Sequence, residues 1–205
     1  MPELVVSGVE PEAGAATPAL RFALEVSDES GREIYTIALS AQVQIDADRR
    51  GYGPETRERL RDLFGEPERI PQTAGVLPLA RLETLVPSFR GSGSFALRVP
   101  VSGDLELASS RYLASLGDGA IPLTFLFSGS VFYCGEHDRL QVARVPWSCT
   151  ARFRLSLSTW RELLERRYGA SGFVRLGAET LEVLRARRAA LGLPTLEATI
   201  AEAIA

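Results

Sequence analysis

The residues best suited to metal chemistry lie close together in this chain. Its only two cysteines and its only histidine occur within sixteen residues, as Cys134, His137 and Cys149, with Asp138 beside the histidine. Thiolate, imidazole and carboxylate groups are the usual protein ligands of zinc. By composition alone, Cys134, His137 and Cys149 are therefore the candidates for a metal site.

The expected positions of these three residues argue against a shared ion. If residues 125–133 and 139–146 pair as a hairpin, Cys134 and His137 lie at its tip and Cys149 lies past the far end of the return strand. At ~3.3 Å per residue the separation is about 20 Å or more. A disulfide also fails, because its Cα atoms must lie within ~7 Å of each other. We predict no bound metal and no cofactor, with a histidine exposed in the turn.

Motifs for catalysis or phosphate binding are not found in the sequence. It contains no Gly-x-Ser-x-Gly, no Gly-x-x-x-x-Gly-Lys-Ser/Thr, and no Gly-x-Gly-x-x-Gly after a strand. A catalytic triad would have one possible base, His137, at a turn tip with no evident partner. Carboxylate pairs such as Glu66 and Glu68 lie among prolines, and we expect these side chains to be solvent-exposed rather than catalytic. We expect that the protein is not an enzyme.

Apolar side chains in predicted loops suggest a surface for binding another protein. Tyr52, Phe89 and Trp147 lie beside glycine or proline. The prolines of residues 65–78 favour a loop, which retains Leu77, and a short helix is expected from Leu79 to Val86. We predict that a protein partner contacts Phe89, Trp147, Tyr52 and Leu77. The alternative is that residues 65–90 and the C-terminal helices cover these side chains.

Composition limits the class of protein. The 205 residues fit one domain, and all 23 basic residues are arginine. The net charge of −3 argues against a general nucleic-acid-binding protein, which usually has a basic excess. No apolar segment approaches the ~20 residues of a membrane span, and the opening Met-Pro-Glu lacks a signal sequence. We therefore expect a cytoplasmic protein without a membrane span. The oligomeric state does not follow from the sequence.

The elements that would position these residues are mostly strands. The most apolar stretch, residues 119–133, is apolar on both faces, which predicts a central strand that Gly129 weakens or bulges. Residues 20–27 and 35–45 alternate apolar with polar residues around a polar turn at 28–31, which predicts an antiparallel hairpin. Further strands are expected at residues 95–101, 140–145 and 151–157, and residues 4–9 are a short apolar opening.

Helices are expected mainly after the strands. They are predicted at residues 54–64, 108–116, 159–168, 178–191 and 195–204, and Thr159 and Glu162 have capping-box spacing. Strands followed by helices indicate the α+β class. We predict an antiparallel β-sandwich or strongly curved sheet of about six or seven strands, formed by residues 1–157. The alternative is an open sheet with helices on one face. Residues 158–205 would be a helical extension packed on this core, within one domain overall.

The whole chain also resembles a known family. The resemblance lies in Leu63-Phe-Gly-Glu-Pro67, Val86-Pro-Ser-Phe89, residues 119–132, Val145-Pro-Trp147 and Trp160-Arg-Glu162. It is to an uncharacterised actinobacterial family, a domain of unknown function encoded beside NiFe-hydrogenase genes. That gene neighbourhood implies a role in hydrogenase assembly, maturation or support. The family has no established catalytic residues, so the resemblance implies none here.

These observations lead to one expected function and two alternatives. We expect a non-catalytic accessory protein that binds another protein, and the resemblance implies that this partner is a hydrogenase subunit or maturation factor. A metal-binding maturation factor would need Cys134, His137 and Cys149 to converge. A small-molecule-binding β-sandwich would need a closed pocket between its sheets.

Overall fold

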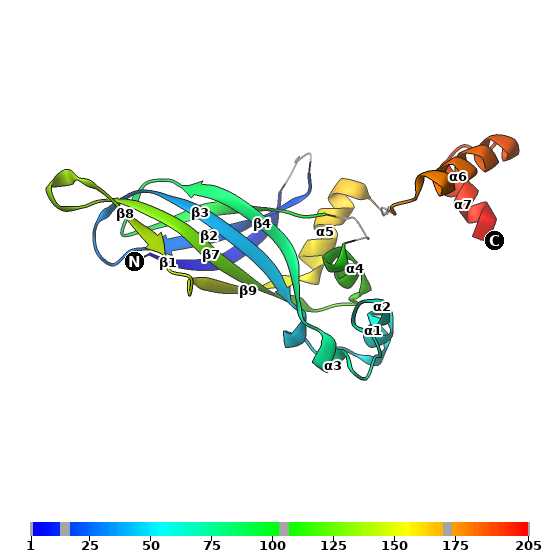
Figure 1. Ribbon diagram of the computed structural model, residues 1–205, viewed down its shortest axis with the longest axis horizontal. Coiled ribbons are helices and arrows are strands. Elements are labelled where there is room, and N and C mark those ends of the chain that lie inside the picture. The colour runs from blue at the N-terminus through cyan, green and yellow to red at the C-terminus, as the bar shows by residue number, and fades with distance from the viewer. Residues whose placement is uncertain (1, 13–16, 103–106, 170–173, 205) are drawn as a thin grey trace. The chain divides into compact units, whose positions relative to one another are not determined.

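The computed structural model describes residues 2–12, 17–102, 107–169 and 174–204 (Figure 1). The chain forms two compact units, Met1–Gly172 and Phe173–Ala205. The second unit contains α6 (Ala178–Leu191) and α7 (Leu196–Ile204), as the sequence predicts. An ion pair of 2.8 Å between Arg187 and Glu202 joins these two helices. The sequence also predicts a brief extended piece at residues 173–176; Phe173 lies outside the described residues, and residues 174–176 form no strand.

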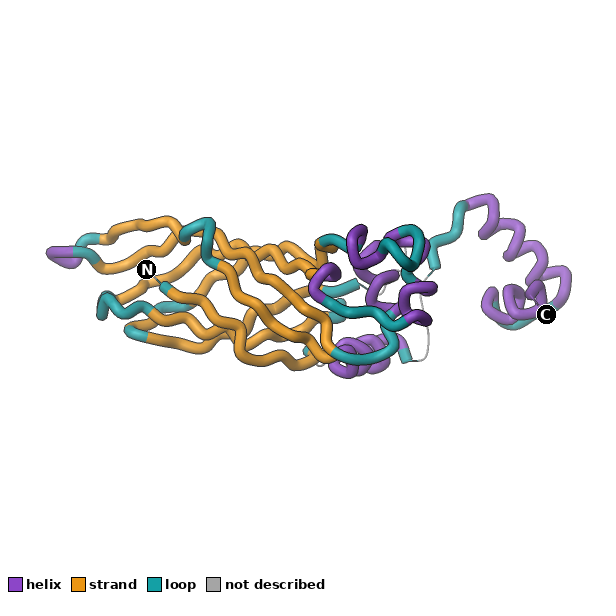
Figure 2. Tube along the Cα trace, turned by 90° about the horizontal axis from the view of Figure 1, so that it is seen from below, coloured by secondary structure: helices purple, strands orange, loops and turns teal. Residues whose placement is uncertain are grey.

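The first unit is built on two antiparallel sheets, which confirms the predicted α+β class (Figures 1 and 2). The smaller sheet has the order β1-β2-β6, with β1 (Glu3–Pro11), β2 (Ala19–Ser27) and β6 (Ser92–Pro100). The larger has the order β4-β3-β7-β8, with β5 also paired to β3 and β9 to β7. Its strands are β3 (Glu33–Asp46), β4 (Val76–Val86), β5 (Phe89–Arg90), β7 (Ala120–Cys134), β8 (Leu140–Val145) and β9 (Thr150–Ser156).

Strand β7 is the centre of the larger sheet, as its apolar sequence predicts. It pairs with β3 along one side and with β8 and β9 along the other. Its inward side chains meet the smaller sheet, where the ring of Phe22 lies 5.0 Å from Phe125 and 5.4 Å from Phe153, edge to face. Such aromatic pairs add to the stability that burial gives. The two sheets therefore enclose one shared hydrophobic core.

The predicted hairpin of residues 20–27 and 35–45 is wrong. Both segments are strands, but β2 pairs with β1 and β6, whereas β3 pairs with β4, β5 and β7. The turn after Ser27 thus carries the chain from one sheet to the other. Each strand does bury one face, as its alternation predicts. Alternation specifies which side chains point inward, and it does not specify which strand lies alongside.

The structure also corrects the prediction for residues 65–90. This segment contains a short helix, α3 (Ile70–Thr73), and then the strand β4 where a loop and helix were expected. The partners of Val43 and Gln44 on β3 are Ala80 and Pro78, so Leu79 is an extra residue. The bulge shifts the phase of the inward-facing positions at this point, so the alternation that predicts a strand is interrupted.

The helices of the first unit gather at the end of the sandwich opposite the turn between β7 and β8 (Figures 1 and 2). They are α1 (Pro54–Arg59), α2 (Arg61–Phe64), α3, α4 (Ala108–Ser115) and α5 (Leu157–Tyr168), with the 3-10 turn η1 (Ala47–Arg49) next to α3. A second 3-10 turn, η2 (Glu136–Asp138), lies between β7 and β8. The predicted helix of residues 54–64 is thus broken at Leu60.

Helix α5 packs on the β-sandwich next to β1 and β9, with Trp160 and Leu163 buried. Its N-cap is Ser156, three residues before the Thr159 that the capping-box spacing predicts. The Ser156 hydroxyl caps it by accepting a hydrogen bond of 3.2 Å from the amide of Ser158. The predicted packing of residues 178–204 on the core stays a prediction. In the described residues, no helix has the length and apolar character needed to cross a membrane.

Candidate protein-binding surface

Two of the candidate metal ligands lie at the tip of the β7–β8 hairpin, as predicted. Cys134 pairs with Leu140 across the hairpin, and its thiol lies 3.5 Å from the Asp138 carboxylate. His137 and Asp138 both have left-handed backbones, with φ of 58° and 54°. These unusual conformations turn the chain within a few residues, so they have a structural explanation.

Cys149 lies at the other end of β8. Its carbonyl accepts a hydrogen bond of 3.0 Å from the amide of Phe127. Phe127 is seven residues before Cys134 along β7, which corresponds to roughly 23 Å at ~3.3 Å per residue. The two thiols are therefore too far apart to bind one ion or form a disulfide. In the described residues, no group of three or more His, Cys, Asp and Glu side chains is placed to hold a metal.

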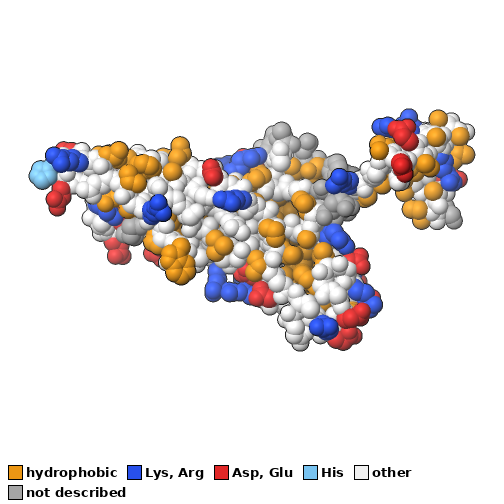
Figure 3. All heavy atoms as spheres, in the orientation of Figure 1, with side chains coloured by type: hydrophobic (Ala, Val, Ile, Leu, Met, Phe, Trp, Pro, Cys, Tyr) orange, Lys and Arg blue, Asp and Glu red, His pale blue; other side chains and the backbone are white. Residues whose placement is uncertain are grey.

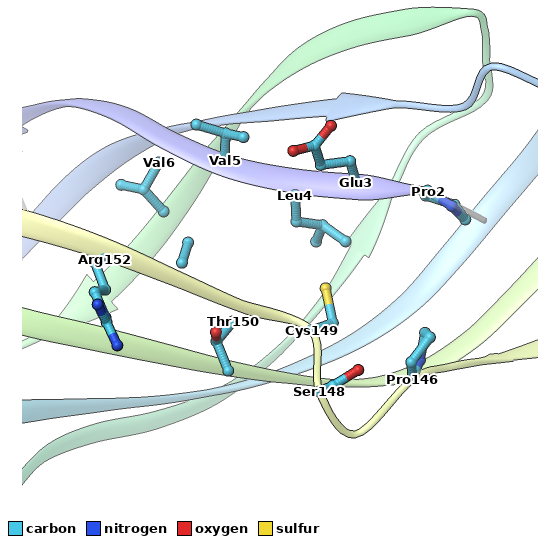
Figure 4. Close-up of a pocket in the computed structure, with 11 residues that line it drawn as sticks. Pro2, Glu3, Leu4, Val5, Val6, Pro146, Ser148, Cys149, Thr150 and Arg152 are labelled. Atoms are coloured by element: carbon cyan, nitrogen blue, oxygen red, sulfur yellow. The ribbon is translucent and has the colours of Figure 1, made fainter.

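The thiol of Cys149 points toward Leu4 in a hollow between β1 and β9 (Figure 4). This hollow has a volume of about 490 Å³ and is open to solvent. Burial raises the pKa of the Cys149 thiol, partly offset by a hydrogen bond with the backbone of Leu4. A raised pKa keeps the thiol protonated at neutral pH, which does not suit a nucleophile.

Two of the four predicted partner-contacting residues lie in the core, contrary to the expected exposure. Tyr52 is buried, and its hydroxyl lies 2.5 Å from the Ala47 carbonyl and 2.8 Å from the hydroxyl of Tyr112. Phe89 is buried against Phe95, with ring centres 5.8 Å apart. Burial leaves neither ring free to anchor a partner. The flanking glycines and prolines lie between regular elements, and they do not determine whether the aromatic side chain is exposed.

Leu77 and Trp147 differ from that pair. Leu77 lies on β4, half-buried against the core. Trp147 is 93% exposed, the highest value among the exposed large apolar side chains of the described residues. It lies in the turn between β8 and β9, which a hydrogen bond of 2.9 Å from the Cys149 amide to the Pro146 carbonyl closes. The structure therefore leaves Trp147 as the available aromatic anchor among the four.

Further apolar side chains are exposed on the outward face of β8. Leu140 is 62% exposed and Val142 is 56% exposed, and Val142 pairs with the half-buried Phe132 on β7. We call the outward side chains of β8 and β9, with Trp147 between them, the β8–β9 face. Apolar side chains of this kind are visible over the strand region in Figure 3. An exposed apolar cluster of this kind is typical of a binding surface.

Sequence reasoning did not assign Leu140 and Val142 to a surface. A signal was present, because Leu140 and Val142 are two residues apart and Val145 is three residues further on. An odd separation puts Val145 on the opposite face of the same strand. Val145 is buried, so the other two must face solvent or a partner.

Comparison with known proteins places the chain in a family. Residues 1–205 match the model of a family of unknown function, DUF6084. The chain belongs to this family. No curated protein matches the chain. The DUF6084 chain is also similar to the solution structure of a putative late embryogenesis abundant protein, with 10% identity over 76% of this chain and 71% of that one. The TM-score of 0.36 is too low for that likeness to inform fold or function.

Proposed function

We propose that this protein is a non-catalytic accessory protein that binds another protein through the β8–β9 face, with Trp147 as the anchor. The observation that carries the proposal is the 93% exposure of Trp147. Tryptophan is among the residues that contribute most to protein–protein affinity, and its ring offers a large apolar area to a partner. The exposed Leu140 and Val142 extend that area along the same edge of the sheet.

The turn that carries Trp147 is anchored rather than free. Its Cys149 amide donates to the Pro146 carbonyl, and the Cys149 carbonyl accepts from Phe127 on the central strand. Such an anchor lowers the conformational entropy that the turn loses on binding. The backbone that presents Trp147 is therefore preorganised for binding.

The partner we propose is a NiFe hydrogenase subunit or one of its maturation factors. Support comes from the resemblance to an actinobacterial family encoded beside NiFe-hydrogenase genes. Neither alternative function has a comparable observation in its favour. The space between the sheets is filled by Phe22, Phe125 and Phe153, which leaves little room for a small molecule there.

Co-purification with defined proteins tests the proposal. The tagged protein is co-expressed with the subunits and maturation factors of a NiFe hydrogenase from the same genome. We expect wild type to capture one of them and Trp147→Ala to weaken the complex by roughly thirtyfold, because anchor residues contribute about 2 kcal/mol or more. The unfolding midpoint of the variant should stay close to that of wild type.

Leu85→Ala is the matched control. Leu85 is 70% exposed on the same sheet but on β4, at the opposite edge from β8. This variant should retain full capture. Equal capture by wild type and Trp147→Ala, or capture of none of the co-expressed proteins, would count against the proposal.

A further inference from the structure

The charge of the chain is distributed unevenly around Trp147. Residues 139–161 contain five arginines and no aspartate or glutamate. The whole chain has 26 acidic and 23 basic residues, for a net charge of −3. The segment that forms β8, the Trp147 turn and β9 is therefore a basic region in an acidic protein.

Three of these arginines lie on the β8–β9 face. Arg144 pairs with Ser130, Arg152 with Thr124 and Arg154 with Pro122 along β7. These β7 positions are all even-numbered, as is Phe132 opposite Val142, so the four pairs share the outward face of the sheet. The Trp147 turn connects the two strands, between Arg144 and Arg152 in the chain.

Among the described residues, these side chains have no acidic partner. Arg144, Arg152 and Arg154 are exposed, and none of the three guanidinium groups forms an ion pair or hydrogen bond with a described residue. Other arginines of the same sandwich do, as Arg98 shows with Glu12 at 2.6 Å. The positive charge of the β8–β9 face is therefore uncompensated.

The neighbouring strands of the same sheet add little negative charge, and Glu3 of β1, which lines the same hollow as Arg152, forms no ion pair with it. Across β7, β8, β9 and residues 36–46 of β3 there is one carboxylate, Asp46. It is buried, and it accepts a hydrogen bond of 2.7 Å from the hydroxyl of Thr124 and lies 3.7 Å from Arg49. The negative charge of Asp46 is therefore already paired with Arg49 and the Thr124 hydroxyl.

We infer that the occupant of the β8–β9 face is an acidic segment of a protein, in which Asp or Glu side chains flank an apolar one. This inference rests on the proposed function and adds the chemistry of the partner. The arginine guanidinium can bind a carboxylate through two parallel hydrogen bonds, and complementary charge selects partners and speeds their encounter. Trp147 would contact the apolar side chain, whereas Val142 and Leu140 lie further along β8 toward the hairpin tip.

Charge also disfavours the other occupants. In a two-fold contact between copies of this chain, each face would meet itself and bring the arginines of both copies together. Nucleic-acid-binding proteins usually have a basic excess over the whole domain, which this protein lacks. The exposed aliphatic residues beside the arginines fit a protein better than a phosphate backbone.

Selection from a random peptide library on the immobilised full-length protein tests the inference. We expect enrichment of peptides with Asp or Glu around an aromatic or aliphatic residue. By fluorescence anisotropy, Arg152→Glu/Arg154→Glu should bind the selected peptide at least about tenfold more weakly, and added salt should weaken binding to wild type. Arg81→Glu, an exposed reversal on β4 of the same sheet, is the control and should bind normally.

The outcomes separate this inference from the proposed function. If selected peptides lack acidic residues and their binding depends on Trp147 but not on Arg152, Arg154 or salt, the acidic chemistry is wrong and protein binding stands. If phosphatidylglycerol vesicles or single-stranded DNA bind with the same variant dependence and no acidic peptide does, the partner class is wrong. If no peptide is selected and Trp147→Ala captures hydrogenase proteins as wild type does, both proposals fail.

Discussion

The hydroxyl groups of Tyr52 and Tyr112 lie 2.8 Å apart in a buried pair that joins the loop before α1 to helix α4. The Tyr52 hydroxyl donates its proton to the Ala47 carbonyl at 2.5 Å, so the Tyr112 hydroxyl must donate to Tyr52. The rings also meet edge to face, with centres 6.3 Å apart. This pair links helix α4 to the chain that follows β3, and so holds the helices of the first unit against its strands.

Replacement of Tyr52 by phenylalanine should destabilise the protein by about 1–3 kcal/mol, because it leaves the Ala47 carbonyl and the Tyr112 hydroxyl without their partner. Urea unfolding followed by circular dichroism measures this difference. Tyr133→Phe is the control, since its hydroxyl bonds Gln141 in an exposed position, and it should change stability by no more than ~0.5 kcal/mol. Equal effects of the two variants would contradict the buried pair.

The same pair predicts an alkaline limit to stability. Burial raises the pKa of both Tyr52 and Tyr112 above the usual value of 10.0. Above that pH the unfolded chain loses protons that the folded chain retains, so stability falls as pH rises. Phenolate absorbance should show that these two tyrosines ionise only when the protein unfolds. Reversible ionisation of all five tyrosines in the folded state would refute this.

Gly129→Ala should be severely destabilising. The backbone of Gly129 has φ of 146°, and an added Cβ would lie 2.0 Å from the Ala38 carbonyl oxygen on β3. Strain at such a backbone and overpacking each cost roughly 1–3 kcal/mol, so we expect a loss of about 3 kcal/mol or more. Gly51→Ala, with open space around its Cβ, is the control and should be nearly neutral. Similar urea midpoints would show that the β3–β7 register is wrong.

Phe125→Ala should cost about 3–5 kcal/mol, as truncation of a buried phenylalanine does. Phe125 is fully buried and contacts both Phe22 and Phe127. Leu140→Ala removes an apolar side chain that is already 62% exposed and should change stability by ~0.5 kcal/mol or less. Differential scanning calorimetry of both variants would compare them directly, and a small effect at Phe125 would contradict the shared core.

Asp28 should give the fold an acid-sensitive component. Burial alone would raise its pKa, but hydrogen bonds from Ser30 at 2.5 Å and Arg32 at 3.3 Å outweigh burial and lower the pKa below 3.8. Such a group stabilises the protein above its unfolded pKa, and this stability is lost as pH falls through the lower folded pKa. We expect Asp28→Asn to cost about 1–3 kcal/mol at neutral pH and less below about pH 3.

Urea unfolding of wild type and Asp28→Asn over that pH range measures the effect. Glu29→Gln, an exposed neighbour in the same turn, is the control and should follow wild type at every pH. A difference between wild type and Asp28→Asn that stays constant with pH would mean that the carboxylate charge is not what stabilises the turn.

The sequence predicted the character of most strands, because burial leaves a pattern in the side chains themselves. Strand β7 is apolar on both faces and lies between two neighbours, whereas β2 and β9 alternate and bury one face. The bulge expected at Gly129 is not present, because β7 and β3 pair in continuous register at this residue. The glycine serves the close approach of Ala38 instead. A glycine within a strand is compatible with either a bulge or the close approach of another backbone, so the sequence alone does not distinguish them.

Only the tertiary structure decided how the strands pair and which aromatic residues are exposed. Strands β2 and β3 flank a short turn as a hairpin would, yet they belong to different sheets. Tyr52, Phe89 and Trp147 all lie near glycine or proline, yet Tyr52 and Phe89 are buried and Trp147 is exposed. The physical reason is that the pattern of apolar and polar residues along a strand determines which face of that strand is buried. Contacts between segments far apart in the chain determine what covers that face.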